Sequence, residues 1–215
     1  MNLNSLSKGE NFPTKVKDGL WAFPPRKGFD ENISWWVDSS PEPVLIDCPS
    51  ISKEIVKLLK ELSQGRSTRI LLTSRDAHGR VAELQEELQW PVVVQEQEAY
   101  LLPSINNLET FSEEYSTIGG IHLIWTPGPT PGSCVIYAPK LINVLFCGRL
   151  LIPFDSYKLA SLRNRKTFHW STQLKSIQKI KKRFPSKPFP LLASGVEHPG
   201  EGSIRLVEWN DWISP

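Results

Sequence analysis

Residues 126–133 read T-P-G-P-T-P-G-S, and this alternation of proline and glycine constrains the fold more than any other part of the sequence. Proline fixes the backbone φ angle and removes a hydrogen-bond donor, so Pro127 and Pro131 exclude a helix or a central strand here. Gly128 and Gly132 allow the unusual φ angles that tight turns require. Apolar residues precede and follow this stretch, which therefore predicts a shaped turn between two strands.

Elsewhere the apolar residues follow the two periods that indicate strands and amphipathic helices. Helices are expected over residues 51–61, near 80–88 and within 166–184. Strands are expected over residues 20–23, 33–37, 43–48, 68–73, 92–94, 121–125, 133–138, 143–147 and 190–193. Residues 95–102 are predicted to start a helix or to form a loop. This order of elements predicts an α/β protein in which helices cover a sandwich of sheets.

The length of 215 residues suits one domain, and we expect a loose N-terminal arm over residues 1–15 and a single domain over 16–215. The formal net charge of +2 indicates no particular partner. The three cysteines form no C-x-x-C pair and are expected to be reduced thiols. No apolar run approaches the roughly 20 residues that span a bilayer, and the N-terminus lacks the apolar core of a signal peptide. These features predict a soluble, cytoplasmic protein.

Five short segments match, in their order along the chain, the motifs of one family. They read L-I-D-C at 45–48, I-L-L-T-S-R-D-A-H-G at 70–79, T-P-G-P-T-P-G-S at 126–133, L-F-C-G-R at 145–149 and L-L-A-S-G at 191–195. The family has a strand ending in Asp, then H-x-H-x-D-H, T-P-G-H-T-x-G-S, L-F-x-G-D and a strand ending near G-H-G. The chain thus resembles the metallo-β-lactamase-fold superfamily over about residues 18–205. The resemblance implies an αββα sandwich, with two packed mixed β-sheets and helices on their outer faces.

In this family, histidines and aspartates at the motif positions hold one or two metal ions, which supply hydroxide near neutral pH. The equivalent positions here are Ser74, Asp76, His78, Gly79, Pro129, Arg149 and either Ser194 or Gly195. Pro129 has no side-chain donor, and Arg149 places a positive charge where a bridging aspartate would lie. The resemblance implies that Asp47 supports the site through hydrogen bonds to nearby backbone. The turns are retained while the ligands are lost, so we expect a degenerate metal site, no cofactor and no catalytic residue.

Two kinds of function follow from this cleft. The first is a non-catalytic protein, a pseudoenzyme, that serves as a binding or scaffolding domain. Arg75 and Arg149 would then make the cleft cationic and suit an anionic small molecule, or Arg149 would pair with Asp76 and simply fill the space of the metal. The alternative is a reduced metallohydrolase, in which Asp76, His78 and His198 hold one zinc or iron ion and cleave an ester, thioester or phosphodiester.

A third hypothesis concerns residues 155–190, which contain ten lysines or arginines and one acidic residue, Asp155. Such a charge asymmetry suits an acidic macromolecule, although an ordinary solvated helix face has the same pattern. The sequence contains no specific nucleic-acid motif, and no aromatic platform interleaved with the basic residues was identified. The identity of any partner is therefore left open.

Overall fold

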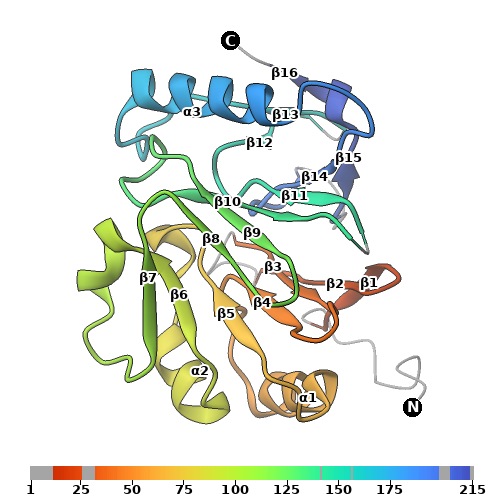
Figure 1. Ribbon diagram of the computed structural model, residues 1–215, viewed down its shortest axis with the longest axis vertical. Coiled ribbons are helices and arrows are strands. Elements are labelled where there is room, and N and C mark those ends of the chain that lie inside the picture. The colour runs from red at the N-terminus through yellow and green to blue at the C-terminus, as the bar shows by residue number, and fades with distance from the viewer. Residues whose placement is uncertain (1–11, 26–31, 141, 156, 199–203, 214–215) are drawn as a thin grey trace.

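The computed structural model describes residues 12–25, 32–140, 142–155, 157–198 and 204–213, and it is layered (Figure 1). Helices α1 (Lys53–Ser63) and α2 (Val81–Leu88) cover one outer face, and α3 (Trp170–Arg183) covers the opposite one. Two β-sheets lie between these helical layers. The predicted αββα sandwich is confirmed. No helix among the described residues is long and apolar enough to cross a membrane.

The first sheet has seven strands in chain order, and its direction changes midway. The strands are β1 (Thr14–Lys17), β2 (Leu20–Phe23), β3 (Ser34–Val37), β4 (Val44–Ile46), β5 (Arg69–Leu71), β6 (Val92–Gln95) and β7 (Leu108–Phe111). The pairs from β1 to β4 are antiparallel, and those from β4 to β7 are parallel. The parallel strands β4, β5 and β6 therefore bring their carboxyl ends to one edge of the sandwich.

The second sheet has six strands in the order β15-β14-β11-β10-β9-β8. The strands are β8 (Glu114–Ser116), β9 (His122–Trp125), β10 (Cys134–Ala138), β11 (Val144–Phe146), β14 (Leu191–Ala193) and β15 (Leu206–Val207). Only β11 and β14 run parallel to each other, so their carboxyl ends also lie together. A small third sheet joins β12 (Ile152–Pro153), β13 (Leu159–Ala160) and β16 (Trp212–Ile213).

The two adjacent tryptophans of β3 show how the sheets are held together. Side chains alternate between the two faces of a strand, so Trp35 and Trp36 point in opposite directions. Trp35 lies between the sheets, where its ring meets Phe146 edge-on at 5.6 Å. Trp36 lies under α1 and α2 and contacts Trp90 at 5.9 Å. Both indoles are buried, which makes β3 a strand with no exposed face.

The helix predictions are confirmed with small shifts of their ends. Helix α1 begins after Ser52, whose side chain accepts a hydrogen bond from the Ile55 amide. Helix α3 begins only after His169, whose ring nitrogen accepts from the Thr172 amide. The stretch 95–102, left open between helix and loop, is a 3₁₀ turn over Glu96–Leu101.

The strands that the sequence did not predict lie mostly at sheet edges. They are β1, β7, β8, β12, β13, β15 and β16. Four of these have only two residues, too few to show an alternating pattern. Strand β1 includes Thr14 and Lys15, which the sequence analysis assigned to the N-terminal arm. Residues 1–11 of that arm lie outside the described part of the chain.

Candidate site at the strand ends

The loops that carry the family motifs meet at one edge of the sandwich. The Thr73 carbonyl accepts a hydrogen bond from the Cys134 amide at 2.8 Å, joining the loop after β5 to the second sheet. The Gly195 amide donates to the Gly148 carbonyl at 2.9 Å. A Cβ atom on Gly195 would lie only 3.1 Å from Gly148, so glycine lets these two loops approach closely. The fold thus brings the loops after β5, β11 and β14 together at this edge.

Asp47 links the end of β4 to Thr73 in the loop after β5. It follows β4 in a left-handed conformation (φ 63°) and is buried. Its carboxylate accepts from the Thr73 amide at 2.7 Å and from the Thr73 hydroxyl at 2.8 Å. These bonds fix the end of β5 against the end of β4. The Asp47 carboxylate thus bonds to nearby backbone, and a supporting role in a functional site stays a prediction.

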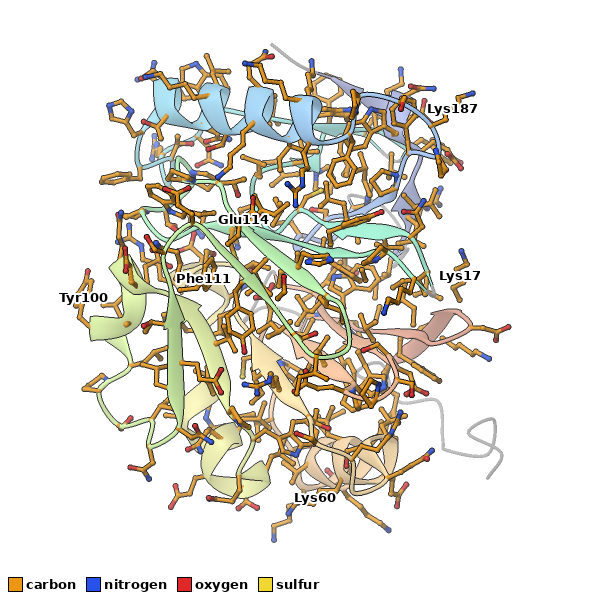
Figure 2. All side chains as sticks on the ribbon, viewed as in Figure 1. Lys17, Lys60, Tyr100, Phe111, Glu114 and Lys187 are labelled. Atoms are coloured by element: carbon orange, nitrogen blue, oxygen red, sulfur yellow. The ribbon has the colours of Figure 1, made fainter. Side chains whose placement is uncertain are left out.

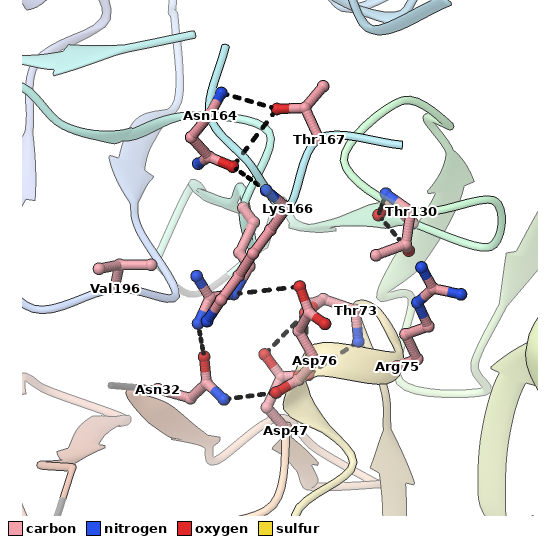
Figure 3. Close-up of polar contacts among 12 residues, drawn as sticks. Asn32, Asp47, Thr73, Arg75, Asp76, Thr130, Asn164, Lys166, Thr167 and Val196 are labelled. Atoms are coloured by element: carbon pink, nitrogen blue, oxygen red, sulfur yellow. Dashed lines mark hydrogen bonds and ion pairs between the residues drawn. The ribbon is translucent and has the colours of Figure 1, made fainter. Parts of the chain in front are cut away.

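Arg149 contacts groups from two other segments, and Figure 3 shows the two partners, Asn32 and Asp76. Its Nη2 donates to the Asn32 Oδ1 at 2.8 Å, and its Nε lies 3.7 Å from the Asp76 Oδ2. The Asn32 side-chain amide donates in turn to the Asp76 backbone carbonyl at 2.6 Å. The Arg149 side chain is only 15% exposed, so this polar network is partly shielded from water. We call Asn32, Asp76 and Arg149 the arginine network.

Arg75 does not join the arginine network. In the view of Figure 3, Arg75 and Asn32 lie on opposite sides of Asp76.

Glu98 holds the Arg75 loop in place and was not identified from the sequence. Its carboxylate, only 1% exposed, accepts from the Arg75 amide at 2.6 Å and from the Gly132 amide at 3.1 Å. It therefore joins the 3₁₀ turn at Arg75–Ala77 to the turn of residues 126–133. Gly132 is needed here because a Cβ atom at that position would lie 2.7 Å from the Glu98 side chain.

His78 and Ser74 occupy the loop between Thr73 and α2, and both are buried. Burial lowers the pKa of His78 to about 4, with Arg75 acting in the same direction and Asp76 opposing it. His78 is therefore neutral near pH 7. Neither the His78 Nε2 nor the Ser74 hydroxyl has a hydrogen-bond partner within the described part of the protein.

Pro129 and Ser194 complete the motif positions, and neither supplies a metal donor. Pro129 lies buried in the turn after β9, and its carbonyl accepts from the Phe168 amide at 3.0 Å. The Ser194 hydroxyl donates to the Leu151 carbonyl and accepts from the Val196 amide, both at 3.1 Å. Their side chains and backbone groups thus stabilise loops.

His198, the third ligand of the alternative metal site, is also buried. Its Nδ1 lies 3.2 Å from the Asp155 carbonyl. The described residues contain no group of three or more His, Cys, Asp or Glu side chains arranged to hold a metal ion. Asp76, His78 and His198 are all described, so the structure does not bring them together as a metal centre.

The chemistry of the motif positions does not fit the metal that the fold family implies. A catalytic zinc takes three protein ligands, chiefly imidazole and carboxylate, and leaves one position for water. Here the positions offer a proline, a glycine, two serines and an arginine beside the single imidazole of His78, and the Asp76 carboxylate is paired with that arginine. The guanidinium would repel a divalent cation in the same space.

No known family profile matches the sequence, and no curated protein is significantly similar to it. Solved structures do match. The DIM-1 metallo-β-lactamase is 14% identical, with a TM-score of 0.72 over 93% of this chain and 92% of that chain. A metallo-β-lactamase from Pontibacter korlensis is 18% identical, with a TM-score of 0.72 over 93% and 94%. The archaeal superfamily protein ST1585 from Sulfolobus tokodaii is 14% identical, with a TM-score of 0.60 over 84% and 80%. The chain has the metallo-β-lactamase fold.

Proposed function

We propose that this chain is a binding or scaffolding domain of the metallo-β-lactamase fold, in which the arginine network takes the place of a metal centre. The observation that carries the proposal is the position of Arg149. It follows β11, where the family places its bridging aspartate, and its guanidinium binds Asp76 and Asn32. These contacts support the proposal, because the chain itself supplies a cation at this motif position.

The same contacts favour a structural role for Arg149 over the capture of an anionic small molecule. The guanidinium already has a carboxylate partner, and a second anion would compete with Asp76 for it. The second cation that would strengthen such a site, Arg75, makes no ion pair with the described residues of the network. We therefore assign the network to closing the old cleft, and we place binding on other surfaces.

A hydrolase assay tests the proposal directly. The full chain would be incubated, with and without added zinc or iron, with a chromogenic ester, a thioester and a phosphodiester. The His78→Ala variant serves as the comparison, because the alternative metal site requires that imidazole. We expect no turnover that depends on His78 under either condition. Metal-dependent hydrolysis that is lost in His78→Ala would overturn the proposal and support the mononuclear hydrolase.

A further inference from the structure

The turn between β8 and β9 presents one isoleucine to solvent. Ile118 is 77% exposed, more than any other large hydrophobic side chain in the described part of the chain. A single exposed apolar side chain is ordinary on a protein surface, so this exposure alone indicates no partner. The position of Ile118 becomes informative through the way its turn is held and through the cavity beside it.

The turn is fixed by a buried carboxylate. Glu42, only 2% exposed, accepts a hydrogen bond from the Ile118 amide at 3.0 Å. Its other oxygen accepts from the Arg69 Nε at 2.6 Å. The Gly120 amide donates to the Thr117 carbonyl, also at 3.0 Å. The turn is therefore ordered, and a surface ordered before binding loses less entropy when a partner docks.

A small apolar cavity lies directly beside Ile118. Its volume is about 250 Å³, and its wall includes Gly119 and Gly120, the two residues that follow Ile118. Buried apolar side chains form much of the rest of the wall, and they are Val37, Ile121, Ala138 and Ile142. Sites for small molecules usually enclose about 300–1,000 Å³. The cavity therefore suits a protein side chain better than a free small molecule.

We propose that this cavity receives Ile118 of a second copy of the same chain, so that two copies form a two-fold symmetric dimer. Ile118 and the cavity lie next to each other, so a second molecule turned through 180° can satisfy both with the same two features. Such a contact closes on itself, whereas a projecting side chain and a cavity on distant faces would produce an open chain of molecules. Each contact removes an isoleucine side chain from water, which favours association.

The charges around the cavity favour a second copy over a partner of one charge sign. Lys140 is exposed and forms no ion pair among the described residues, and a Cβ atom on Gly120 would lie 3.3 Å from its Cε. Asp38 also lines the cavity, and its side chain is 33% exposed although it pairs with Arg66 at 2.6 Å. When Ile118 enters the cavity of the second copy, it brings Lys140 toward Asp38 of that copy. The reverse pair forms by symmetry, so both copies gain a complementary contact.

The cavity and the arginine network lie at opposite ends of β4. Asp38 precedes this strand, whereas Asp47 follows it and binds Thr73 in the loop after β5. Lys17 marks the cavity side of the molecule in Figure 2, since its Nζ donates to the Ile142 carbonyl at 3.3 Å. No residue of the arginine network lines the cavity, so the dimer is independent of the function proposed above.

Sedimentation-velocity ultracentrifugation of the full chain over a concentration series tests the proposal. We expect a reversible equilibrium between monomer and dimer without larger species, because the contact closes. Ile118→Ser should raise the dissociation constant at least about tenfold, since both copies lose a buried apolar side chain. Lys140→Glu should raise it by roughly threefold or more, and added salt should reduce this effect.

The matched control is Tyr100→Ser, which also removes an exposed apolar side chain. Tyr100 is 70% exposed and lies on the side of the molecule opposite Lys17 (Figure 2). This control should leave the dissociation constant within about twofold, as expected for a distant site. Melting curves measured by circular dichroism would confirm that all variants fold, as expected for exposed positions.

A cross-linking experiment locates the contact. Ser40 is exposed and lines the cavity, and the three native cysteines are buried. A mixture of the Ile118→Cys and Ser40→Cys proteins, treated with a short bis-maleimide, should therefore yield a dimer that contains one chain of each kind. A mixture of the Ile118→Cys and Tyr100→Cys proteins should yield none.

The proposal fails in two cases. A chain that stays monomeric up to about 1 mM would have too weak an affinity for a specific dimer. A dimer that is unchanged in Ile118→Ser, or that gives no cross-link between positions 118 and 40, would use another surface.

Discussion

At the scale of single residues, the proposal rests on Arg149. It follows β11, and its guanidinium lies 3.7 Å from the Asp76 carboxylate. The pair is partly exposed, with the two side chains 15% and 27% accessible, so solvent screens part of its attraction. We therefore expect the Arg149–Asp76 pair to stabilise the fold more than a fully exposed ion pair and less than a fully buried one.

Replacing Arg149 with methionine should destabilise the protein by about 1–2 kcal/mol, because Asp76 and Asn32 then lose a partner. Asp76→Asn provides the second arm of a double-mutant cycle, measured by urea unfolding. The cycle should give a coupling of about 1 kcal/mol between the two side chains. Strictly additive effects would show that the pair contributes nothing to stability.

The fold lowers the pKa of His78, chiefly by burying the imidazole. Its pKa is about 4 in the folded protein, against an ordinary value of 6.5. Between these values the unfolded chain binds more protons than the folded one, so stability falls as the pH falls. The neutral His78 therefore costs no unfolding free energy above about pH 6.5, and the protein loses stability progressively as the pH falls toward 4.

His78→Gln should remove this part of the pH dependence. Between about pH 7.5 and pH 5, the wild-type protein should lose on the order of 2 kcal/mol more unfolding free energy than the variant. The two proteins are compared by how steeply their unfolding free energy changes with pH, because the substitution also changes packing by the same amount at every pH. Parallel curves for the two proteins in urea titrations at both pH values would contradict the lowered pKa.

At the scale of elements, the turn of residues 126–133 is fixed by its contact with α3. Gly128 has a φ of 137°, and a Cβ atom there would lie 2.3 Å from the Gln173 Cα. Helix α3 therefore packs directly against Gly128. Both the positive φ angle and the short distance to Gln173 exclude a side chain at this position.

Gly128→Ala should lower the unfolding free energy by roughly 3 kcal/mol or more. The added Cβ would overlap Gln173, and moving either the turn or the helix backbone would cost free energy. Gly65→Ala is a matched control. Gly65 also has a positive φ, 72°, but an added Cβ would meet no atom within 4 Å. Its cost should be about 1 kcal/mol. Equal losses in melting experiments would show that backbone strain alone, and not the α3 contact, decides the effect.

Glu98 makes a second link between elements, from the 3₁₀ turn at Glu96–Leu101 to two site loops. Glu98→Gln keeps the size but replaces a charged acceptor by a neutral one. We expect a loss of about 1–3 kcal/mol, since hydrogen bonds to charged groups are the stronger ones. The neighbouring Glu96 is exposed and lacks these bonds, so Glu96→Gln should change stability by less than about 0.5 kcal/mol. If both variants were as stable as the wild-type protein, Glu98 would have no role in linking the loops.

The sequence predicted the long elements because their periodicity is strong. The stripe of apolar residues in α1 and the apolar strands β4, β5 and β6 are visible without a structure. The two-residue strands were missed because they depend on neighbours far away in the chain. Strand β7 was missed because it is only partly buried, and its acidic residue, Glu109, weakens the alternation.

The site was predictable only where it coincides with a family motif. Asp47, Asp76 and Arg149 were identified in this way. Asn32 precedes β3 by two residues and carries no pattern of its own, and only the fold brings it to Arg149 across 117 positions. Glu98 looked like a surface acid in a polar stretch. Glu98 is buried because its own turn packs against the loops that contain Arg75 and Gly132, and no local sequence pattern indicates this packing.

At the scale of the whole molecule, the chain keeps the sandwich at identities of only 14–18% to the three solved structures described above. Such retention is expected, since a core tolerates many apolar exchanges if volume and patterning are kept. A site does not tolerate exchange in this way, because its chemistry depends on individual side chains. Identities this low therefore show the fold, and the function of the site has to be argued from its own side chains.

The central claim, that an arginine network has replaced the metal centre, is tested most directly by the metal content of the full chain. The protein would be purified without chelators and measured by inductively coupled plasma mass spectrometry, before and after incubation with zinc or iron and desalting. The account predicts well below one ion per chain in both samples. One or more tightly held zinc or iron ions per chain would contradict it.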